Sequence, residues 1–236
     1  MDWKSNGDAA FQRSKAYKLF SCLFSFPDGP FFEFMEKGEF LSEMKIALER
    51  MGNSAPSLLS TLASSTEESS RFGMNTLQEE YLRLFEDPGQ GSLLHEALYA
   101  DFPQEKMADI AGFYRAFGVD FSQRPDHIGA ELEFMHLLTA KEAQASIGEN
   151  RENVELCLDA QRKFLSSHLG RWIQPMAEGI RSRGGFFYEC FAKSVMEWLN
   201  MESEYLGITL ARVEVPVLKS VEKDEMACPG GRDERV

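Results

Sequence analysis

Residues 124–135 read Arg-Pro-Asp-His-Ile-Gly-Ala-Glu-Leu-Glu-Phe-Met. Pro125 and Asp126 suit the opening of a helix, because proline fits the first helical position and a carboxylate is favoured in the first turn. His127 follows directly, and Glu131 lies about one turn further along the same face. We therefore expect an amphipathic helix that places a polar, titratable cluster at the end of a loop, where binding sites are common.

Apolar residues recur at helical spacing along most of the chain. β-Branched residues are few before residue 208, and no alternating run indicates a strand. Residues 54–70, rich in Ser and Thr, predict a helix followed by a loop, and residues 87–103 predict a long connector. The expected helices cover about residues 8–25, 30–36, 39–51, 76–86, 104–117, 126–146, 150–168, 171–182 and 186–206. The sequence thus predicts an all-α fold, a single helical bundle.

The end of the chain differs in composition from the rest. After Arg212 the sequence turns polar and carries Pro216, Pro229 and paired glycines. Such a segment has too few apolar residues to form a core. We expect residues 1–211 to form one all-helical domain and residues 212–236 to form a flexible, disordered tail.

The composition is typical of a globular protein with an acidic surface. Hydrophobic residues make up 43% and aromatic residues 12% of the 236 residues, which is enough to build a core. The formal net charge of -13 disfavours nucleic acid and anionic membranes as partners and favours a cationic peptide or protein. Many proteins are acidic only for solubility, so the charge indicates a preference without identifying the partner.

The N-terminal region superficially resembles a secretory signal, because Arg13 and Lys15 precede an apolar run through Phe26. Lys18 interrupts that run, however, and Pro-Asp at 27–28 replaces the small residues of a cleavage site. No apolar segment approaches the roughly 18 residues needed to cross a bilayer. The cysteines lack the spacing of a zinc site and require no oxidising compartment. We therefore expect a cytoplasmic protein without membrane insertion.

Two interpretations of Asp126, His127 and Glu131 are open from the residues alone. In the first, they form a polar binding site in which carboxylates accept hydrogen bonds from arginines and His127 changes charge near neutral pH. In the second, Asp126 caps or charges the helix and His127 bonds a loop carbonyl. The segment 126–159 is rich in acids, which is typical of a solvated face and would also attract a cationic peptide.

His95, Glu96 and Tyr99 stand in the long connector at a spacing that suits one helical turn. They either form a hydrogen-bonded triad or simply tie the connector to the bundle. His168 and Trp172 stand at the junction of two expected helices. A helix cap is the ordinary role for that His, and a core position is the ordinary one for that Trp.

Catalytic and metal-binding patterns are weak. Glu133 and His136 form one Glu-x-x-His pair, whereas a di-metal helical bundle needs two such pairs and two further glutamates. The other histidines lack a Glu three residues before them, so we expect no metal site. The sequence has no Gly-x-Ser-x-Gly motif, no P-loop and no recognisable catalytic Cys, so we expect no catalytic residues.

Five ordered motifs resemble those of a known family. They are Glu80-Tyr81-x-x-Leu84-Phe85, Leu94-His95-Glu96-x-x-Tyr99, Ala108-Asp109-Ile110-Ala111-Gly112-Phe113-Tyr114-x-x-Phe117-Gly118, Arg124–Met135 and His168-Leu169-x-x-Trp172. Together, over about residues 10–205, they resemble the redox-enzyme maturation chaperones of the TorD/DmsD/NarJ type. Within that family they look closest to chaperones that serve type II members of the DMSO reductase family.

The resemblance implies an all-helical chaperone of the TorD-like type and no enzymatic activity. Such chaperones bind the catalytic subunit of a molybdopterin oxidoreductase, through its twin-arginine leader peptide or its apo-domain, until the molybdopterin guanine dinucleotide cofactor is inserted. The resemblance implies no stably bound cofactor, at most a transient contact with that cofactor or with GTP, and either a monomer or a domain-swapped dimer. The expected peptide-binding residues are Pro125, Asp126, His127 and Glu131, with His95, Glu96 and Tyr99 from the connector.

Two alternatives remain. One is a helical adaptor protein without a cofactor role, which a panel of peptides would distinguish. The other is an acid–base enzyme that uses Asp126, His127 and Glu131, which would turn over a small molecule.

Overall fold

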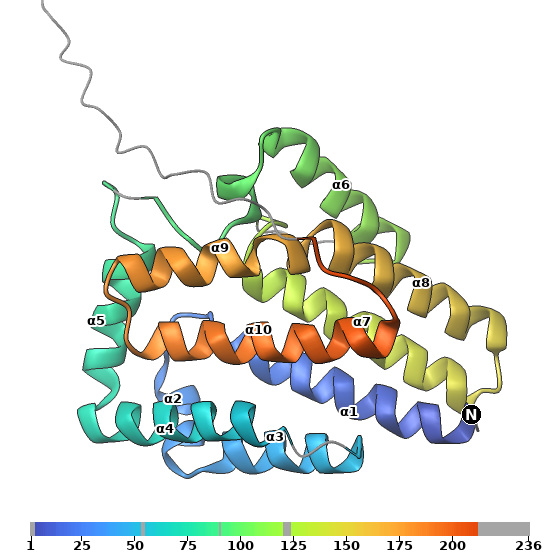
Figure 1. The fold of residues 1–236 in the computed structure, drawn as a ribbon, viewed down its shortest axis with the longest axis horizontal. Helices are drawn as coiled ribbons and strands as arrows, with labels where there is room; N and C mark the ends of the chain where they lie inside the picture. The colour runs from blue at the N-terminus through green and yellow to red at the C-terminus, as the bar shows by residue number, and fades with distance from the viewer. Residues whose placement is uncertain (1–2, 53–54, 90, 120–123, 212–236) are drawn as a thin grey trace, which may run out of the picture.

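The computed structural model describes residues 3–52, 55–89, 91–119 and 124–211 (Figure 1). The helices are α1 (Trp3–Cys22), α2 (Gly29–Glu36), α3 (Glu39–Arg50), α4 (Pro56–Phe72), α5 (Met74–Phe85), the 3-10 turn η1 (Glu96–Tyr99), α6 (Pro103–Ala116), α7 (Ile128–Ile147), α8 (Arg151–Ser167), α9 (Leu169–Ser182) and α10 (Phe187–Leu206). None of these helices is both long enough and apolar enough to cross a membrane. The expected tail, residues 212–236, lies outside the described residues.

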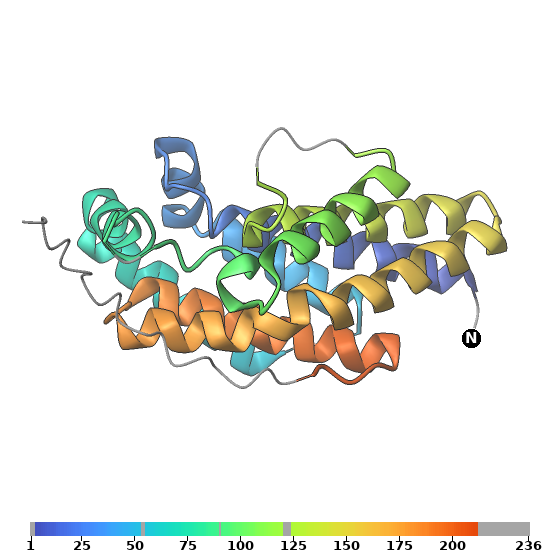
Figure 2. The same cartoon turned by 90° about the horizontal axis from the view of Figure 1, so that it is seen from above.

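The helices pack as a bundle in which neighbours in space are often distant in sequence. Helices α1 and α7 lie side by side along most of their lengths, and α8 packs against α7 (Figures 1 and 2). Helix α10 packs against both α9 and α4, and α1 also contacts α3. The turn η1 contacts both α6 and α9, so the connector after α5 fastens α6 to the side of the bundle.

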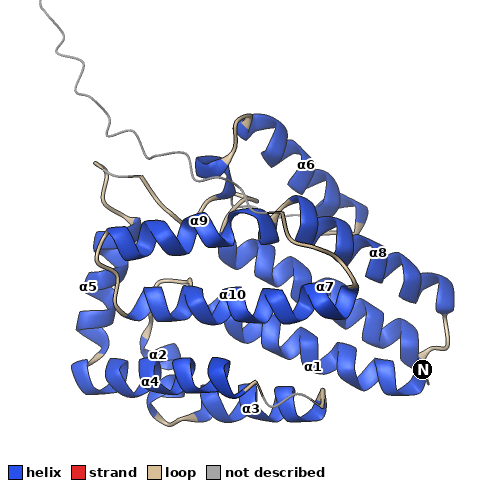
Figure 3. Ribbon diagram, in the orientation of Figure 1, coloured by secondary structure: helices blue, strands red, loops and turns tan. Residues whose placement is uncertain are grey.

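The described residues contain helices, turns and loops but no strand, which confirms the all-α prediction (Figure 3). One boundary prediction is wrong: a loop was expected to follow the helix within residues 54–70, but α4 continues beyond this range. Thr66 Oγ1 donates to the carbonyl of Leu62 at 3.0 Å, one turn back along the helix. Because such hydroxyls find partners inside the helix, the Ser and Thr content does not end it.

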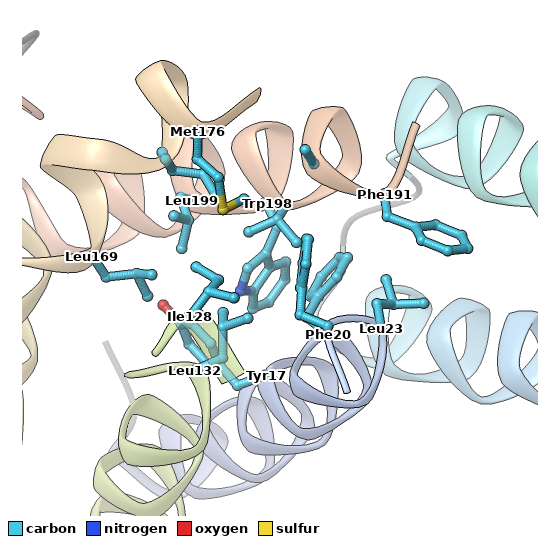
Figure 4. Close-up of a cluster of buried hydrophobic side chains, with 14 of the residues drawn as sticks. Tyr17, Phe20, Leu23, Ile128, Leu132, Leu169, Met176, Phe191, Trp198 and Leu199 are labelled. Atoms are coloured by element: carbon cyan, nitrogen blue, oxygen red, sulfur yellow. The ribbon is translucent and has the colours of Figure 1, made fainter. Parts of the chain in front are cut away.

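The hydrophobic core extends through most of the helices, and one part of it lies where α1, α7, α9 and α10 meet (Figure 4). Tyr17 of α1 and Trp198 of α10 are fully buried, and their rings meet edge to face with centroids 5.4 Å apart. Ile128 and Leu132 of α7 are buried in the same cluster. Ile128 is the first residue of α7, so core packing also fixes the position of the Pro-Asp-His turn before it.

Arg13 of α1 is fully buried among the helices, which the sequence did not predict. Its Nε donates to Glu202 Oε1 of α10 at 2.8 Å, and its Nη1 donates to Glu142 Oε2 of α7 at 2.9 Å. Gln161 of α8 joins this group, donating from Nε2 to Glu142 Oε2 at 2.8 Å. Burial alone lowers the pKa of Arg13, but the two carboxylates hold that pKa above its ordinary value. The cluster therefore ties four helices together through charge-assisted hydrogen bonds.

Candidate functional site

The connector before α6 pairs with the Pro-Asp-His turn before α7. The backbone N–H of Glu96 donates to the carbonyl of Asp126 at 2.9 Å. His95 and His127 form an isolated antiparallel bridge beside this bond, and their ring centroids are 5.2 Å apart. Two motifs that are far apart in the sequence therefore form one structural unit.

The Asp126 side chain is fully buried within this unit. One carboxylate oxygen lies 3.2 Å from His95 Nδ1, and the other accepts from Arg124 Nη2 at 2.8 Å. The N–H of Ala97 also donates to the carboxylate, at 3.2 Å. Burial alone raises the pKa of Asp126, but the donors from His95 and Arg124 hold that pKa well below its ordinary value. Asp126 thus fastens the connector to the turn, and the interpretation in which it caps α7 is wrong, because the N-cap is His127.

His127 is the N-cap of α7, which begins at Ile128 rather than at residue 126. Its Nδ1 accepts a hydrogen bond from the N–H of Gly129 at 3.0 Å. An accepting ring nitrogen carries no proton, so the imidazole is neutral in this arrangement. Burial, together with the charge of His95, lowers the pKa of His127 to about 4. Of the two open interpretations, the one in which His127 changes charge near neutral pH is therefore wrong.

Glu131 and Pro125 also make contacts within the protein. Glu131 is fully buried, and its Oε2 accepts from Trp172 Nε1 of α9 at 3.1 Å. Its Oε1 has no hydrogen-bond partner among the described residues. Burial, together with the charge of Glu96, raises the pKa of Glu131 well above its ordinary value, which favours the protonated form. The carbonyl of Pro125 accepts from the Tyr114 hydroxyl at 2.8 Å.

A cavity of about 510 Å³ lies beside this unit, lined from η1, α6 and α9. The rings of Tyr99 and Trp172 stack on its wall, with centroids 5.6 Å apart and planes inclined by 22°. Phe102, at the edge of α6, is 67% exposed. The full lining consists of Glu96, Tyr99, Ala100, Asp101, Phe102, Glu105, Lys106, Asp109, Arg171 and Trp172.

Acids outnumber bases on the wall of this cavity. The basic residues are Lys106 and Arg171, and Lys106 Nζ already donates to the carbonyl of Ser167 at 3.0 Å. The acidic residues are Glu96, Asp101, Glu105 and Asp109. Carboxylates beside aromatic rings form a combination that suits a guanidinium group, through charge-assisted hydrogen bonds and cation–π contact.

His168 joins two of the acids that line the cavity. It lies at the break between α8 and α9, and its side chain is fully buried. Its Nδ1 is 2.9 Å from Glu96 Oε2, and its Nε2 is 3.2 Å from Asp109 Oδ2. His168 occupies the cap position of both α8 and α9, as interpreted from the sequence, but its ring caps neither helix and instead connects η1 to α6.

Five of the seven predicted peptide-binding residues fall into two groups, and the other two, Pro125 and Glu131, do not line the cavity. Glu96 and Tyr99 line the cavity. His95, Asp126 and His127 belong to the hydrogen-bonded bridge that positions Glu96. The predicted residues thus meet in space, but most of them support the cavity and do not form its surface.

The acids and the aromatic side chain contributed by the α6 region were not among the predicted site residues. Asp101, Glu105 and Asp109 recur every four residues, which places them on one face when the segment is helical. That spacing, next to Phe102, was a signal that could have found them. Trp172 was expected in the core, and it is 1% exposed, yet it also lines the cavity.

The Glu-x-x-His pair of α7 lies apart from this site. Glu133 forms an ion pair with Lys18 of α1, and His136 Nδ1 lies 2.7 Å from Ser14 Oγ of α1. Both contacts hold α7 against α1. In the part of the chain that the structure describes, no group of three or more His, Cys, Asp or Glu could hold a metal ion.

Comparison with known proteins identifies the class. The family described as nitrate reductase delta subunit matches residues 48–178, more than half of the chain. The perchlorate reductase assembly chaperone protein of Dechloromonas aromatica (strain RCB) is 31% identical over 175 residues, covering 70% of this chain and 76% of that protein. The chlorate reductase assembly chaperone protein of Ideonella dechloratans is 33% identical over 118 residues, covering 47% of this chain and 60% of that protein.

These matches define an assembly chaperone rather than an enzyme, which confirms the resemblance to maturation chaperones. The chain belongs to the nitrate reductase delta subunit family. The alternative of an acid–base enzyme is wrong. In agreement with this, Asp126 and Glu131 are fully buried and Asp126 is occupied by neighbouring donors.

Proposed function

We propose that this chaperone acts in the cytoplasm on the catalytic subunit of a molybdopterin oxidoreductase, binding its twin-arginine leader or N-terminal segment before export. The names of the two relatives support a reductase subunit as the client. The observation that carries the proposal is the acidic, aromatic cavity between η1, α6 and α9. Its chemistry suits the guanidinium groups of an arginine-bearing segment.

The energetics are compatible with reversible binding. An apolar stretch follows the arginines of such a leader, and burying roughly 400 Å² of it supplies about 10 kcal/mol before costs. Ordering the peptide and restricting its motion offset much of that gain. We expect a dissociation constant in about the micromolar range, which lets a chaperone release its client.

The molybdopterin guanine dinucleotide cofactor belongs to the client in this proposal. The chaperone would hold the catalytic subunit until that cofactor is inserted, with at most a transient contact with the cofactor or GTP. The alternative is an adaptor without a cofactor role. The molybdenum content of the client, purified from cells with and without the chaperone, separates the two. Unchanged content in its absence would favour the adaptor.

Calorimetric titration of the full chain tests the binding step. The probe is an acetylated peptide with two consecutive arginines and an apolar stretch, and the control peptide has two glutamines instead. We expect the arginine peptide to bind at least about tenfold more tightly, because each guanidinium pairs with carboxylates. Equal affinity, together with no reductase subunit recovered in pull-downs from cells, would contradict the proposal.

A pair of double variants localises the site. Asp101→Asn with Glu105→Gln removes two negative charges from the cavity, and we expect about tenfold weaker binding of the arginine peptide. Glu152→Gln with Glu155→Gln removes the same charge from the first turns of α8, at the other end of that helix from His168. Equal losses in the two double variants would mean that overall charge, and not this cavity, drives binding.

A further inference from the structure

His168 places a titratable ring between two acids of very different exposure. The side chain of Glu96 is 4% exposed, whereas that of Asp109 is 60% exposed. Glu96 belongs to η1 and Asp109 to α6, so the ring joins two of the elements that line the cavity. The rings of Phe164 and Phe113 pack against it, with centroids 5.1 Å and 5.6 Å away. The packing of these rings therefore fixes the position of the His168 ring, and the ring in turn positions the two acids.

The protonation state of the ring decides whether both contacts are favourable. Both ring nitrogens donate only when the ring carries two protons. The imidazolium therefore satisfies Glu96 and Asp109 together when both are ionised. A neutral ring donates from one nitrogen and turns a lone pair towards the other carboxylate, which repels it. Since Glu96 is nearly buried and Asp109 is exposed, Asp109 is the side chain that can move into solvent.

We propose that His168 is a proton-dependent positioning residue of the cavity, whose imidazolium holds Glu96 and Asp109 in the arrangement that binds a cationic peptide. Loss of the proton breaks the contact between the ring and Asp109. The ring then no longer links α6 to η1. Affinity for an arginine-bearing segment then falls where rising pH removes this proton. The inference rests on the proposed function.

The other groups around His168 make the sign of this effect informative. Two basic residues stand next to it: Lys106 of α6 donates to the carbonyl of Ser167, and the backbone N–H of Arg171 of α9 donates to the carbonyl of His168. Burial, together with the charge of Glu96, raises the pKa of Glu131 of α7. Simple electrostatics predicts the opposite trend, because removing the positive charge of His168 should strengthen binding of a cation. A fall in affinity with rising pH therefore indicates positioning.

Ring protonation is measured by long-range ¹H–¹⁵N NMR on the labelled full chain between about pH 6 and about pH 9. The chain has four histidines. His95→Gln, His127→Gln and His136→Gln therefore assign the His168 signal by elimination, even where His168→Gln does not fold. We expect two ring protons at the lower pH and one at the higher pH. A ring that keeps the same number of protons throughout would overturn the inference.

Peptide binding supplies the second readout, with a matched pair of variants. In Asp109→Asn the amide accepts from a protonated Nε2 or donates to an unprotonated one, so the contact survives in both states. Asp101→Asn removes the same charge from the same cavity without touching the hydrogen bonds of His168. We expect wild type and Asp101→Asn to bind the arginine peptide about tenfold more weakly at about pH 8.5 than at about pH 6.5, and Asp109→Asn to change by about twofold or less.

Affinity that rises with pH in the wild type, or a pH dependence in Asp109→Asn equal to that of the wild type, would overturn the inference. A peptide that binds at no pH would refute the proposed function instead. In that case the NMR experiment still decides whether His168 exchanges its proton, and an unchanged ring would overturn the inference.

Discussion

The molecule contains two clusters of buried charge that are built from similar groups but stand in different surroundings. Around Arg13 every charged member is closed off, and the side chains of Glu142 and Glu202 are each 1% exposed. Around His168, by contrast, Asp109 is 60% exposed and lines a cavity. The Arg13 cluster therefore fixes the fold, whereas the His168 cluster can respond to solvent and ligand. The same chemistry supports the structure in one place and forms a site in the other.

The Arg13 cluster should give the largest effect on stability. Arg13→Met should lower the free energy of unfolding by about 3–5 kcal/mol, because it leaves buried carboxylates without their partner. Urea denaturation followed by circular dichroism measures the loss. Lys15→Met, on the same helix but 40% exposed, is the control and should change the free energy by no more than about 0.5 kcal/mol. A loss below about 1 kcal/mol in Arg13→Met would remove the contrast between the two clusters.

Asp126 shares a property with each of the two clusters. It is buried like Arg13, and like His168 it belongs to the candidate site. Asp126→Asn should lower the free energy of unfolding by about 2 kcal/mol near neutral pH, because charged hydrogen bonds from Arg124 and Ala97 are weakened. The pKa of Asp126 is lower in the folded state, so this advantage is present above about pH 4 and is lost as the pH falls further. Unfolding measured at neutral and acidic pH checks both points. An equal difference between wild type and variant at both pH values would contradict the assignment.

His127 should give the smallest of these effects. His127→Ala removes the N-cap of α7 and should cost about 1 kcal/mol, whereas His127→Asn keeps an accepting oxygen and should cost less. The folded-state pKa of about 4 lies below the usual value, so the unfolded chain takes up the proton first as the pH falls. Wild type should therefore lose stability between about pH 6.5 and about pH 4, and both variants should lose less. Thermal unfolding across this range is the measurement, and parallel curves for all three proteins would contradict the role of His127.

The helices could be predicted from the sequence because apolar spacing reports which face of a segment is buried. The same signal was available for Arg13, which shares a face with the buried Ala10, Tyr17 and Phe20. A charged side chain on an apolar face predicts a buried partner, but the partners lie on three other helices. Their identity depends on tertiary packing, which spacing within one segment does not encode.

The site could be predicted only in part for a related reason. The Pro-Asp-His motif and the connector motif do meet, through the bond from Glu96 to the carbonyl of Asp126. Residue types alone, however, did not reveal that Asp126 is occupied by its neighbours while the exposed acids come from α6 and the loop before it. Which carboxylate is buried and which faces a cavity is decided by the path of the connector. That path is set by contacts between η1, α6 and α9.

Photocrosslinking from the edge of the cavity tests the central claim most directly. Benzoylphenylalanine replaces Phe102, which is 67% exposed and lines the cavity, or Phe72, which is 53% exposed at the end of α4. On illumination with the arginine-bearing leader peptide, we expect a crosslink from position 102 that an excess of unlabelled peptide suppresses, and none from position 72. Equal crosslinking at both positions, or none at position 102 while the peptide binds, would contradict the assignment of this cavity as the site that receives the client.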